Sequence, residues 1–181
     1  MQYNNQYYKM MIKNNSATAE FINKKRWDYI KELNPQIVLD YGSGCNFLTK
    51  FAPKNIIVDS FDIGHLNGKL YPQTGILHDY YDLIFFNDVI EHVDWKNNPD
   101  NNIEKIFQKT NYIFISIPIC SDIKNLKNWK HYKPGEHLTY FTKKSIEDFL
   151  NTRNFTIVKK SSVECPPRKD IFSFVYKKEK K

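Results

Sequence analysis

A pair of glycines stands directly after the first apolar run of the chain. Residues 37–44 read Ile-Val-Leu-Asp-Tyr-Gly-Ser-Gly, the pattern of a buried strand that runs into a tight turn. Gly42 and Gly44 allow the backbone to adopt positive φ and to come within contact distance of a ligand. Because ligands of open parallel sheets bind beyond the carboxyl ends of the strands, the pattern predicts a binding turn. The alternative is a turn with a purely structural use.

Carboxylates near this turn indicate the charge of the ligand. A dinucleotide fingerprint would place its third glycine at Phe47, and Asp40, Asp59 and Asp62 would repel a pyrophosphate. These acids suit a cation instead, such as S-adenosylmethionine with its sulfonium, ammonium and ribose diol. Asp62 lies 22 residues after Asp40, where a carboxylate at the end of a second strand could accept hydrogen bonds from both ribose hydroxyls. Asp59 is the alternative, because strand ends are uncertain by a few residues.

Histidines are the candidate bases. The pattern places His92 and His137 on two loops that face one cleft, where a neutral imidazole can take a proton from a nucleophilic oxygen or nitrogen. The alternative for His92 is a structural place beside Glu91 in a turn that starts a helix. No metal site is expected, because the His and Cys residues lack a compact ligand spacing. The residues considered for a metal are His92, Cys120, His131 and His137.

Short apolar runs separated by helical patterns indicate the fold. The runs are rich in β-branched and aromatic residues and too short for helices, so we expect buried parallel strands. They cover residues 37–39, 56–61, 83–86 and 112–117. Helical patterns cover 16–33, 46–52, 101–108 and 143–151, the last with Thr142 as its N-cap. Two final strands, expected to pair as an antiparallel hairpin, cover 155–159 and 171–176.

This alternation predicts an α/β fold. We expect an open, mostly parallel, seven-stranded Rossmann-like sheet with helices on both faces and an antiparallel C-terminal edge hairpin. The 181 residues are close to the length of one domain. We therefore expect a single domain over 1–181, with a helical segment at 1–35, a cofactor-binding core at 36–160 and a frayed basic tail at 177–181.

Composition argues against several classes of protein. The chain is 41% hydrophobic and 26% charged, as globular proteins are, and its apolar runs are far shorter than the ~20 residues of a membrane helix. Its three cysteines form no C-x-x-C pair, so no disulfide framework is expected. The N-terminus lacks the apolar region of a secretion signal, and we expect a cytoplasmic protein. The net charge of +7 comes mainly from lysine, and we assign most of it to solvated surface.

Three stretches of the chain resemble one known family. Residues 38–44 resemble its first motif, an acid followed by glycines at alternate positions. Residues 81–93 resemble a fourth strand that runs into D-V-(L/I)-E-H, and residues 131–141 are similar to a loop on the substrate side. The family is the class I (Rossmann-like) S-adenosylmethionine-dependent methyltransferases, and the second stretch is similar to their small-molecule branch. The chain departs from the family at Asn46, where a third glycine is usual, and in the short segment 64–78.

The resemblance and the spacing together imply roles for individual residues. The implied cofactor is S-adenosylmethionine, and its implied contacts are Asp40, Gly42, Ser43, Gly44, Asp62, Asn87 and Asp88. An alternative for Asp88 is to cap the turn that follows it. Acceptor contacts are implied at His131, Tyr132 and Tyr140, and His92 and His137 are the catalytic candidates.

These features predict a methyltransferase that moves a methyl group to an oxygen or nitrogen of a small molecule by in-line displacement. Positioning supplies most of the acceleration, and a base is needed only where the acceptor keeps its proton. One alternative is a nucleic-acid methyltransferase, although residues 87–90, Asn-Asp-Val-Ile, replace the Asp/Asn-Pro-Pro-aromatic signature of adenine methylation. Another is a binding module that keeps the fold without turnover. No membrane partner is expected.

Overall fold

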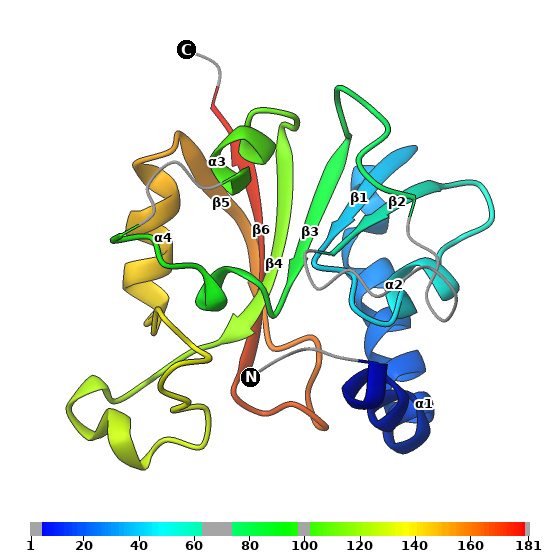
Figure 1. The fold of residues 1–181 in the computed structure, drawn as a ribbon. Helices are drawn as coiled ribbons and strands as arrows, with labels where there is room; N and C mark the ends of the chain where they lie inside the picture. Colours follow the sequence, from blue (N-terminus) through cyan, green and yellow to red (C-terminus); the bar gives the residue numbers. More distant parts are fainter. Residues whose placement is uncertain (1–4, 63–73, 98–101, 180–181) are drawn as a thin grey trace.

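The computed structural model describes residues 5–62, 74–97 and 102–179, which form an α/β fold around a six-stranded sheet (Figure 1). The strand order is β2-β1-β3-β4-β6-β5. The first four strands are parallel, and β6 is antiparallel to both of its neighbours, β4 and β5. The strands are β1 (Ile37–Tyr41), β2 (Ile57–Phe61), β3 (Leu83–Asn87), β4 (Tyr112–Pro118), β5 (Phe155–Ser161) and β6 (Ile171–Lys178).

Helices cover both faces of this sheet, as the alternating pattern predicts. The first two pack on one face and the last two on the other. The helices are α1 (Asn5–Ile30), α2 (Phe47–Lys50), α3 (Asn102–Phe107) and α4 (Lys143–Asn151). Three short 3-10 helices complete the described elements: η1 (Lys31–Leu33), η2 (Ile90–His92) and η3 (Ile123–Asn128).

The central strands are buried on both faces. Side-chain direction alternates along a strand, so in β3 Leu83 and Phe85 pack in the layer of α1 and α2, while Ile84 and Phe86 pack in the layer of α3 and α4. All four side chains are fully buried. Burial on both faces explains why the strands read as continuous apolar runs rather than as alternating patterns.

The parallel order brings the carboxyl ends of β1, β2 and β3 to one edge of the sheet. Tyr41 at the end of β1 pairs in register with Phe61 of β2 and with Phe86 of β3. After β1 the chain forms β2 on one side, and β3 then lies on the other side of β1. The crevice at such a switch point is where ligands bind in open α/β sheets.

The described residues form six strands, so the expected count of seven is wrong for this part of the chain. The connection from β2 to β3 contains no strand where it is described. There the Gly75 N–H donates to the Ser60 carbonyl (3.0 Å), but the Leu77 N–H donates to the Asp59 carboxylate (3.0 Å) instead of to a backbone carbonyl. Side-chain bonds thus replace the backbone ladder that a further strand would need.

Both ends of the described chain differ from expectation. Helix α1 starts at Asn5 instead of residue 16 and stops at Ile30. At the other end, Lys177 pairs in register with Tyr112, and the Lys178 ammonium donates to the Phe107 carbonyl (3.1 Å). The tail expected to fray from 177 is therefore part of β6 up to Lys178, and residues 180–181 lie outside the described residues.

Candidate cofactor and acceptor site

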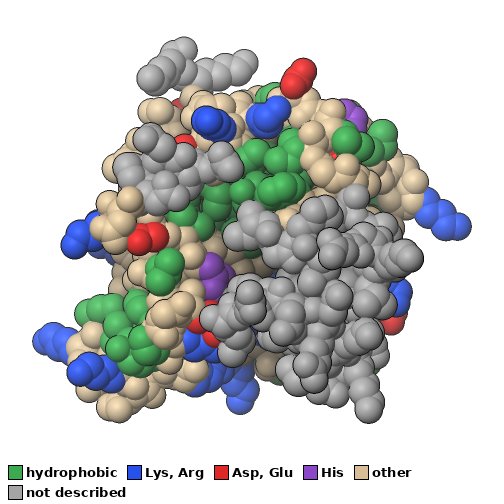
Figure 2. Space-filling model, viewed as in Figure 1, with side chains coloured by type: hydrophobic (Ala, Val, Ile, Leu, Met, Phe, Trp, Pro, Cys, Tyr) green, Lys and Arg blue, Asp and Glu red, His purple; other side chains and the backbone are tan. Residues whose placement is uncertain are grey.

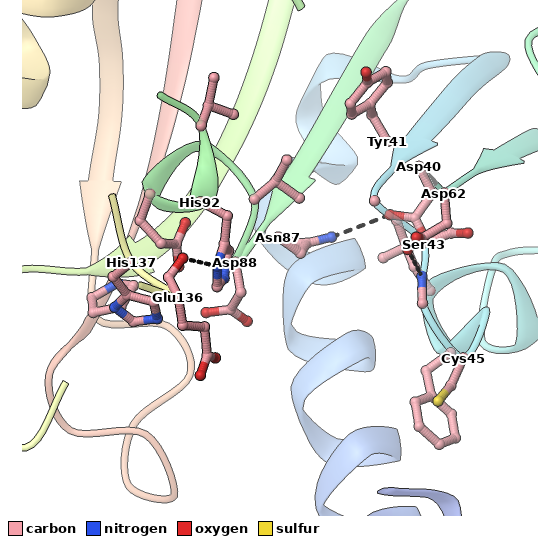
Figure 3. Close-up of a pocket in the computed structure, with 18 of the residues that line it drawn as sticks. Asp40, Tyr41, Ser43, Cys45, Asp62, Asn87, Asp88, His92, Glu136 and His137 are labelled. Atoms are coloured by element: carbon pink, nitrogen blue, oxygen red, sulfur yellow. Dashed lines mark hydrogen bonds between the residues drawn. The ribbon is translucent and has the colours of Figure 1, made fainter. Parts of the chain in front are cut away.

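A cavity of about 530 Å³ opens at the carboxyl ends of β1 and β3. Figure 3 shows Asp40, Asp62 and Ser43 on one side of it, and His92 and His137 on the other together with Asp88 and Glu136. Asn87 lies between the two groups. Its wall contains ten of the residues that the sequence singled out, so the topology brings most of the expected site together. They are Asp40, Gly42, Ser43, Gly44, Asp62, Asn87, Asp88, His92, His131 and His137.

The turn after β1 needs its glycines. Gly42 has φ +80°, and a Cβ atom there would lie 2.4 Å from the Val89 Cγ2 atom, well inside contact distance. Its N–H donates to the Phe61 carbonyl (2.7 Å), which joins the turn to the end of β2. Gly44 has φ +50°, and Asn46, at the place of the family's third glycine, tolerates φ +54° as asparagine often does.

The two candidate ribose acids lie in different surroundings. Asp62 lines the cavity, and its carboxylate accepts the Gly44 N–H at 2.8 Å. Asp59 is buried and accepts hydrogen bonds from the Tyr81 hydroxyl (2.6 Å) and from His78 Nδ1 (2.9 Å). Burial alone would raise the pKa of Asp59, but these bonds hold it below its ordinary value. The geometry thus makes Asp59 a structural acid and places Asp62 at the cavity.

Asp40 is a buried carboxyl group at the end of β1. Burial raises its pKa to about 7, against the opposing effects of nearby Arg26 and of a long hydrogen bond from Asn87 Nδ2 (3.5 Å). The Ser43 hydroxyl and the Asn87 Oδ1 atom are also buried and have no hydrogen-bond partner among the described residues. This side of the cavity therefore offers a carboxyl group and two further oxygens to a ligand that donates hydrogen bonds.

An ion network that the sequence did not reveal lies next to these residues. Arg168 donates to the carboxylates of Asp88 (2.5 Å) and Glu164 (2.7 Å), and Arg26 donates to Glu164 (2.7 Å). The Ser116 hydroxyl also bonds to Glu164, which is fully buried. Burial would raise the pKa of Asp88, but the Arg168 guanidinium holds it below its ordinary value. Asp88 therefore has its carboxylate bound to arginine instead of capping the next turn.

Histidines gather with one acid on the opposite side of the cavity. Ligand atoms of Glu91, His92 and His137 all lie within 4.8 Å of one another. Glu91 is only 2% exposed, and neither of its carboxylate oxygens has a hydrogen-bond partner among the described residues. Burial, and then the nearby Asp88 carboxylate, raise the pKa of Glu91 well above its ordinary value. Sequence analysis predicted only a structural place in a turn for Glu91. The approach of His137 from a distant loop depends on the packed fold and has no local signal in the sequence.

Backbone bonds fix this cluster. The N–H groups of Leu138 and Thr139 both donate to the Glu91 carbonyl (2.8 and 3.0 Å), which holds the loop of His137 against η2. His92 Nδ1 lies 2.9 Å from the Glu136 carbonyl. Because a carbonyl only accepts, Nδ1 carries a proton, and in the neutral ring the lone pair is on Nε2. Burial, and then repulsion from His92, lower the pKa of His137 to about 4, so this imidazole is neutral at pH 7.

The three residues implied to bind the acceptor are not equivalent in the structure. His131 lines the cavity, and burial lowers its pKa. Tyr132 and Tyr140 are not among the lining residues and pack on each other with ring centroids 5.5 Å apart. Cys120, considered with the histidines as a metal ligand, is buried and also lies outside the lining.

Comparison with known proteins decides the family. A family model described as a methyltransferase domain matches residues 14–160, which is more than half of the chain. The chain belongs to the methyltransferase family. Methyltransferases with this domain take the methyl group from S-adenosylmethionine, so the expected enzyme class and cofactor are confirmed. No curated protein sequence has a significant match to the chain.

Solved structures of other methyltransferases share the fold. An S-adenosylmethionine-dependent methyltransferase from Archaeoglobus fulgidus has a TM-score of 0.66 and 17% identity, covering 95% of this chain and 100% of that one. Magnesium protoporphyrin IX methyltransferase from Synechocystis PCC 6803, with bound S-adenosylhomocysteine, has a TM-score of 0.61 and 15% identity, covering 90% and 84%. A 16S rRNA methylase has a TM-score of 0.52 and 16% identity, covering 88% and 83%. At these identities the likeness concerns the fold alone.

The same methyltransferase fold thus occurs with a porphyrin and with an RNA as acceptor, so the fold leaves the acceptor class open. Among the described residues, no helix has the length and apolar character needed to cross a bilayer.

Proposed function

We propose that this methyltransferase transfers the methyl group of S-adenosylmethionine to an oxygen or nitrogen of a small molecule. The observation that carries the proposal is the division of the cavity into two chemically different sides. Carboxyl groups and the glycine turn form one side, and the Glu91, His92 and His137 cluster forms the other. A cationic donor fits the first side, and a nucleophilic acceptor that must lose a proton fits the second.

The residues on the first side fit the cofactor. Asp40, with the partnerless oxygens of Ser43 and Asn87, suits an ammonium group that donates several hydrogen bonds. Asp62 lines the cavity beside the turn and suits the ribose diol, while Gly42 and Gly44 allow close approach of the backbone. We assign Asp88 a positioning role, because its carboxylate is bound to Arg168.

The residues on the second side act on the acceptor. When bound, S-adenosylmethionine supplies a methyl carbon that its sulfonium already activates. The walls of the cavity hold the acceptor in line with that carbon and exclude water. The Nε2 lone pair of His92 can take the acceptor proton, because Nδ1 donates to the Glu136 carbonyl. The neutral ring of His137 and the side chain of His131 also line this side of the cavity.

A small acceptor is favoured over a nucleic acid by the placement of positive charge. Nucleic-acid binding relies on clustered Lys and Arg side chains. The chain has three arginines, and two of them, Arg26 and Arg168, line the cavity and are bound to the carboxylates of Glu164 and Asp88. On the face shown in Figure 2, the basic side chains of the described residues lie toward the rim, several of them at the lower left, and do not form one patch across that face.

Two measurements test this proposal. Thermal shifts with S-adenosylmethionine, S-adenosylhomocysteine and NAD should show stabilisation by the first two only, because a ligand that binds the folded state raises the melting temperature. Methyl-labelled S-adenosylmethionine should then transfer label to the small-molecule fraction of a cell extract and not to its RNA or DNA. Label found only in nucleic acid would reject the small-molecule acceptor while leaving the cofactor assignment intact.

A further inference from the structure

We propose that Glu91, His92 and His137 bind a divalent transition-metal ion on the acceptor side of the cavity. The three side chains come from η2 and from the loop after η3, and their ligand atoms lie within 4.8 Å of one another. Two of them are separated from the third by more than forty positions in the sequence, so the fold and not local spacing creates the group. The role of the ion in catalysis rests on the proposed function, whereas the site itself rests on geometry.

The burial of Glu91 points to a missing partner. Its side chain is 2% exposed, both carboxylate oxygens lack a hydrogen-bond partner among the described residues, and it lines the cavity. Buried carboxylates are normally paired, hydrogen-bonded or bound to a metal, because an unsatisfied one is costly. The nearby Arg168 guanidinium does not relieve it, since Arg168 bonds to Asp88 and Glu164 instead. A cation between Glu91 and the two imidazoles would supply the partner.

Hydrogen bonds and ring packing hold the two histidines in positions suited to metal binding. Metal-binding imidazoles commonly donate their other ring N–H to a carbonyl or carboxylate, which fixes the ring and the tautomer. His92 does this through Nδ1 and the Glu136 carbonyl at 2.9 Å, so that Nε2 carries the lone pair. The ring of His137 lies edge-on to that of His92, with centroids 4.8 Å apart. The bonds of Leu138 and Thr139 to the Glu91 carbonyl hold the two segments in this arrangement.

The ligand set indicates which ions fit. Two imidazoles and one carboxylate suit Zn²⁺, Co²⁺ or Mn²⁺, whereas Mg²⁺ prefers oxygen ligands and water. Three protein ligands leave a coordination position for another group, as in catalytic rather than structural sites. Because these residues line the cavity, that position faces the acceptor.

The ion narrows the class of acceptor to one with a hydroxyl group. A bound cation lowers the pKa of a coordinated hydroxyl. Because the ion then occupies the Nε2 lone pair of His92, the hydroxyl proton passes to solvent instead of to that ring. The oxygen forms a bond to the methyl carbon, and the bond from that carbon to sulfur breaks, which leaves S-adenosylhomocysteine. No oxidant or reductant is needed for this step.

Metal binding can be measured without the acceptor. The chain is freed of metal with a chelator and titrated with Zn²⁺ by calorimetry and with Co²⁺ by visible absorption. We expect one ion per chain, with a Kd of about 1 μM or tighter. The visible d–d absorption bands should be those of Co²⁺ with a low coordination number. Glu91→Gln and His137→Gln should each weaken binding by at least about 100-fold. Glu136→Gln and His78→Gln are the matched controls and should bind like wild type, because neither side chain belongs to the cluster.

The Glu91→Gln variant separates lost binding from lost folding. An amide has the shape of the carboxylate without its charge, so the metal-free variant should melt at or above the temperature of metal-free wild type. Wild type should be stabilised by Zn²⁺ and the variant should not. The inference is wrong if metal-free wild type takes up no ion at millimolar Zn²⁺, or if both cluster variants bind as tightly as wild type. S-adenosylhomocysteine titrated in parallel distinguishes the two proposals: cofactor binding without metal binding rejects only the ion.

Discussion

The Asp62 carboxylate accepts the Gly44 N–H at 2.8 Å, so the end of β2 is joined to the turn after β1 through a side chain that also lines the cavity. Asp59, three residues earlier, instead joins β2 to Tyr81 and His78 in the following connection. Asp59 within β2 and Asp62 just after it therefore have different tasks.

Asp62→Ala should weaken binding of S-adenosylhomocysteine by roughly 1–3 kcal/mol through loss of charge-assisted ribose contacts, with little change in melting temperature. Asp59→Ala should lower the melting temperature and leave the affinity for S-adenosylhomocysteine nearly unchanged, because it leaves the buried Tyr81 hydroxyl without its acceptor. Calorimetry and thermal melting on both variants check this. A normal affinity in Asp62→Ala together with a loss in Asp59→Ala would mean that the ribose assignment is wrong.

Gly42→Ala should destabilise the fold more than Gly135→Ala does. Both glycines have positive φ, at +80° and +84°, so each substitution should cost about 1 kcal/mol of backbone strain. Only at Gly42 would the new Cβ meet a neighbour, Val89, and the overlap should cost roughly 1–3 kcal/mol more. Urea unfolding gives the difference, and Val89→Ala in the Gly42→Ala background should recover part of it. Equal losses at the two glycines would contradict the close approach.

Binding of S-adenosylhomocysteine should weaken as pH falls below about 7. Burial raises the pKa of Asp40 to about 7 in the free protein, where Arg26, Asn87 and Asp62 face it, and the ligand ammonium requires the ionised form. Affinity should then fall by up to about tenfold per pH unit. Asp40→Asn should bind weakly at every pH, and calorimetry across this range shows the contrast.

The ligand-free protein should show the opposite trend in stability. Because the pKa of Asp40 is raised from 3.8 to about 7 on folding, the folded chain holds a proton that the unfolded chain has lost between these values. The contribution of Asp40 to the free energy of unfolding is thus present at low pH and decreases as pH rises to about 7. The free energy of unfolding, measured with urea, should therefore depend on pH differently in wild type and in Asp40→Asn over this window. The same pH dependence in both proteins would exclude the raised pKa.

Glu164→Gln should destabilise the protein by about 3–5 kcal/mol, because it leaves the buried Arg26 and the partly buried Arg168 with one less negative partner. Glu20→Gln, which removes an exposed pair with Lys24, should change stability little. Denaturant unfolding of the two variants provides the comparison. A small loss of stability in Glu164→Gln would show that water or a rearrangement of side chains supplies the lost partner of the two guanidinium groups.

His92→Gln should lower kcat by about 10²–10⁴-fold while leaving the affinity for S-adenosylhomocysteine unchanged. His131→Gln should mainly raise the KM for the acceptor, because His131 lines the cavity outside the three-residue cluster. Steady-state kinetics and cofactor titration distinguish the two effects. Full kcat in His92→Gln would leave positioning alone as the source of catalysis.

The strands and the last helix could be predicted from the sequence because their signals are local. A strand buried on both faces has to read as an apolar run. Thr142 does cap α4 as predicted: its hydroxyl accepts the Ser145 N–H, and its own N–H donates to the Ser145 hydroxyl in return. The N-terminal limit of α1 was predicted too late in the chain, because apolar residues before 16, such as Tyr8, Met11 and Ile12, also have helical spacing.

The site was predicted where residues adjoin strand ends and missed where distant segments meet. The choice between Asp59 and Asp62 depends on where β2 ends to within a few residues, and the hydrophobic pattern does not define that position. The pairing of Arg26 with Glu164 spans 138 positions, and the approach of His137 to Glu91 depends on a loop conformation. Contacts of this kind follow from the packed fold and not from local pattern.

The position of β6 between β4 and β5 has a consequence for synthesis of the chain. β5 is made before β6 but contacts the rest of the sheet only through it. The nascent chain therefore cannot complete its sheet until residues 171–178 have emerged from the ribosome. Glu164, which neutralises Arg26 from the segment just before β6, also arrives late. Until then the edge of β4 that faces β6 has no partner strand, and an unpaired edge of this kind makes an unfinished chain prone to aggregation.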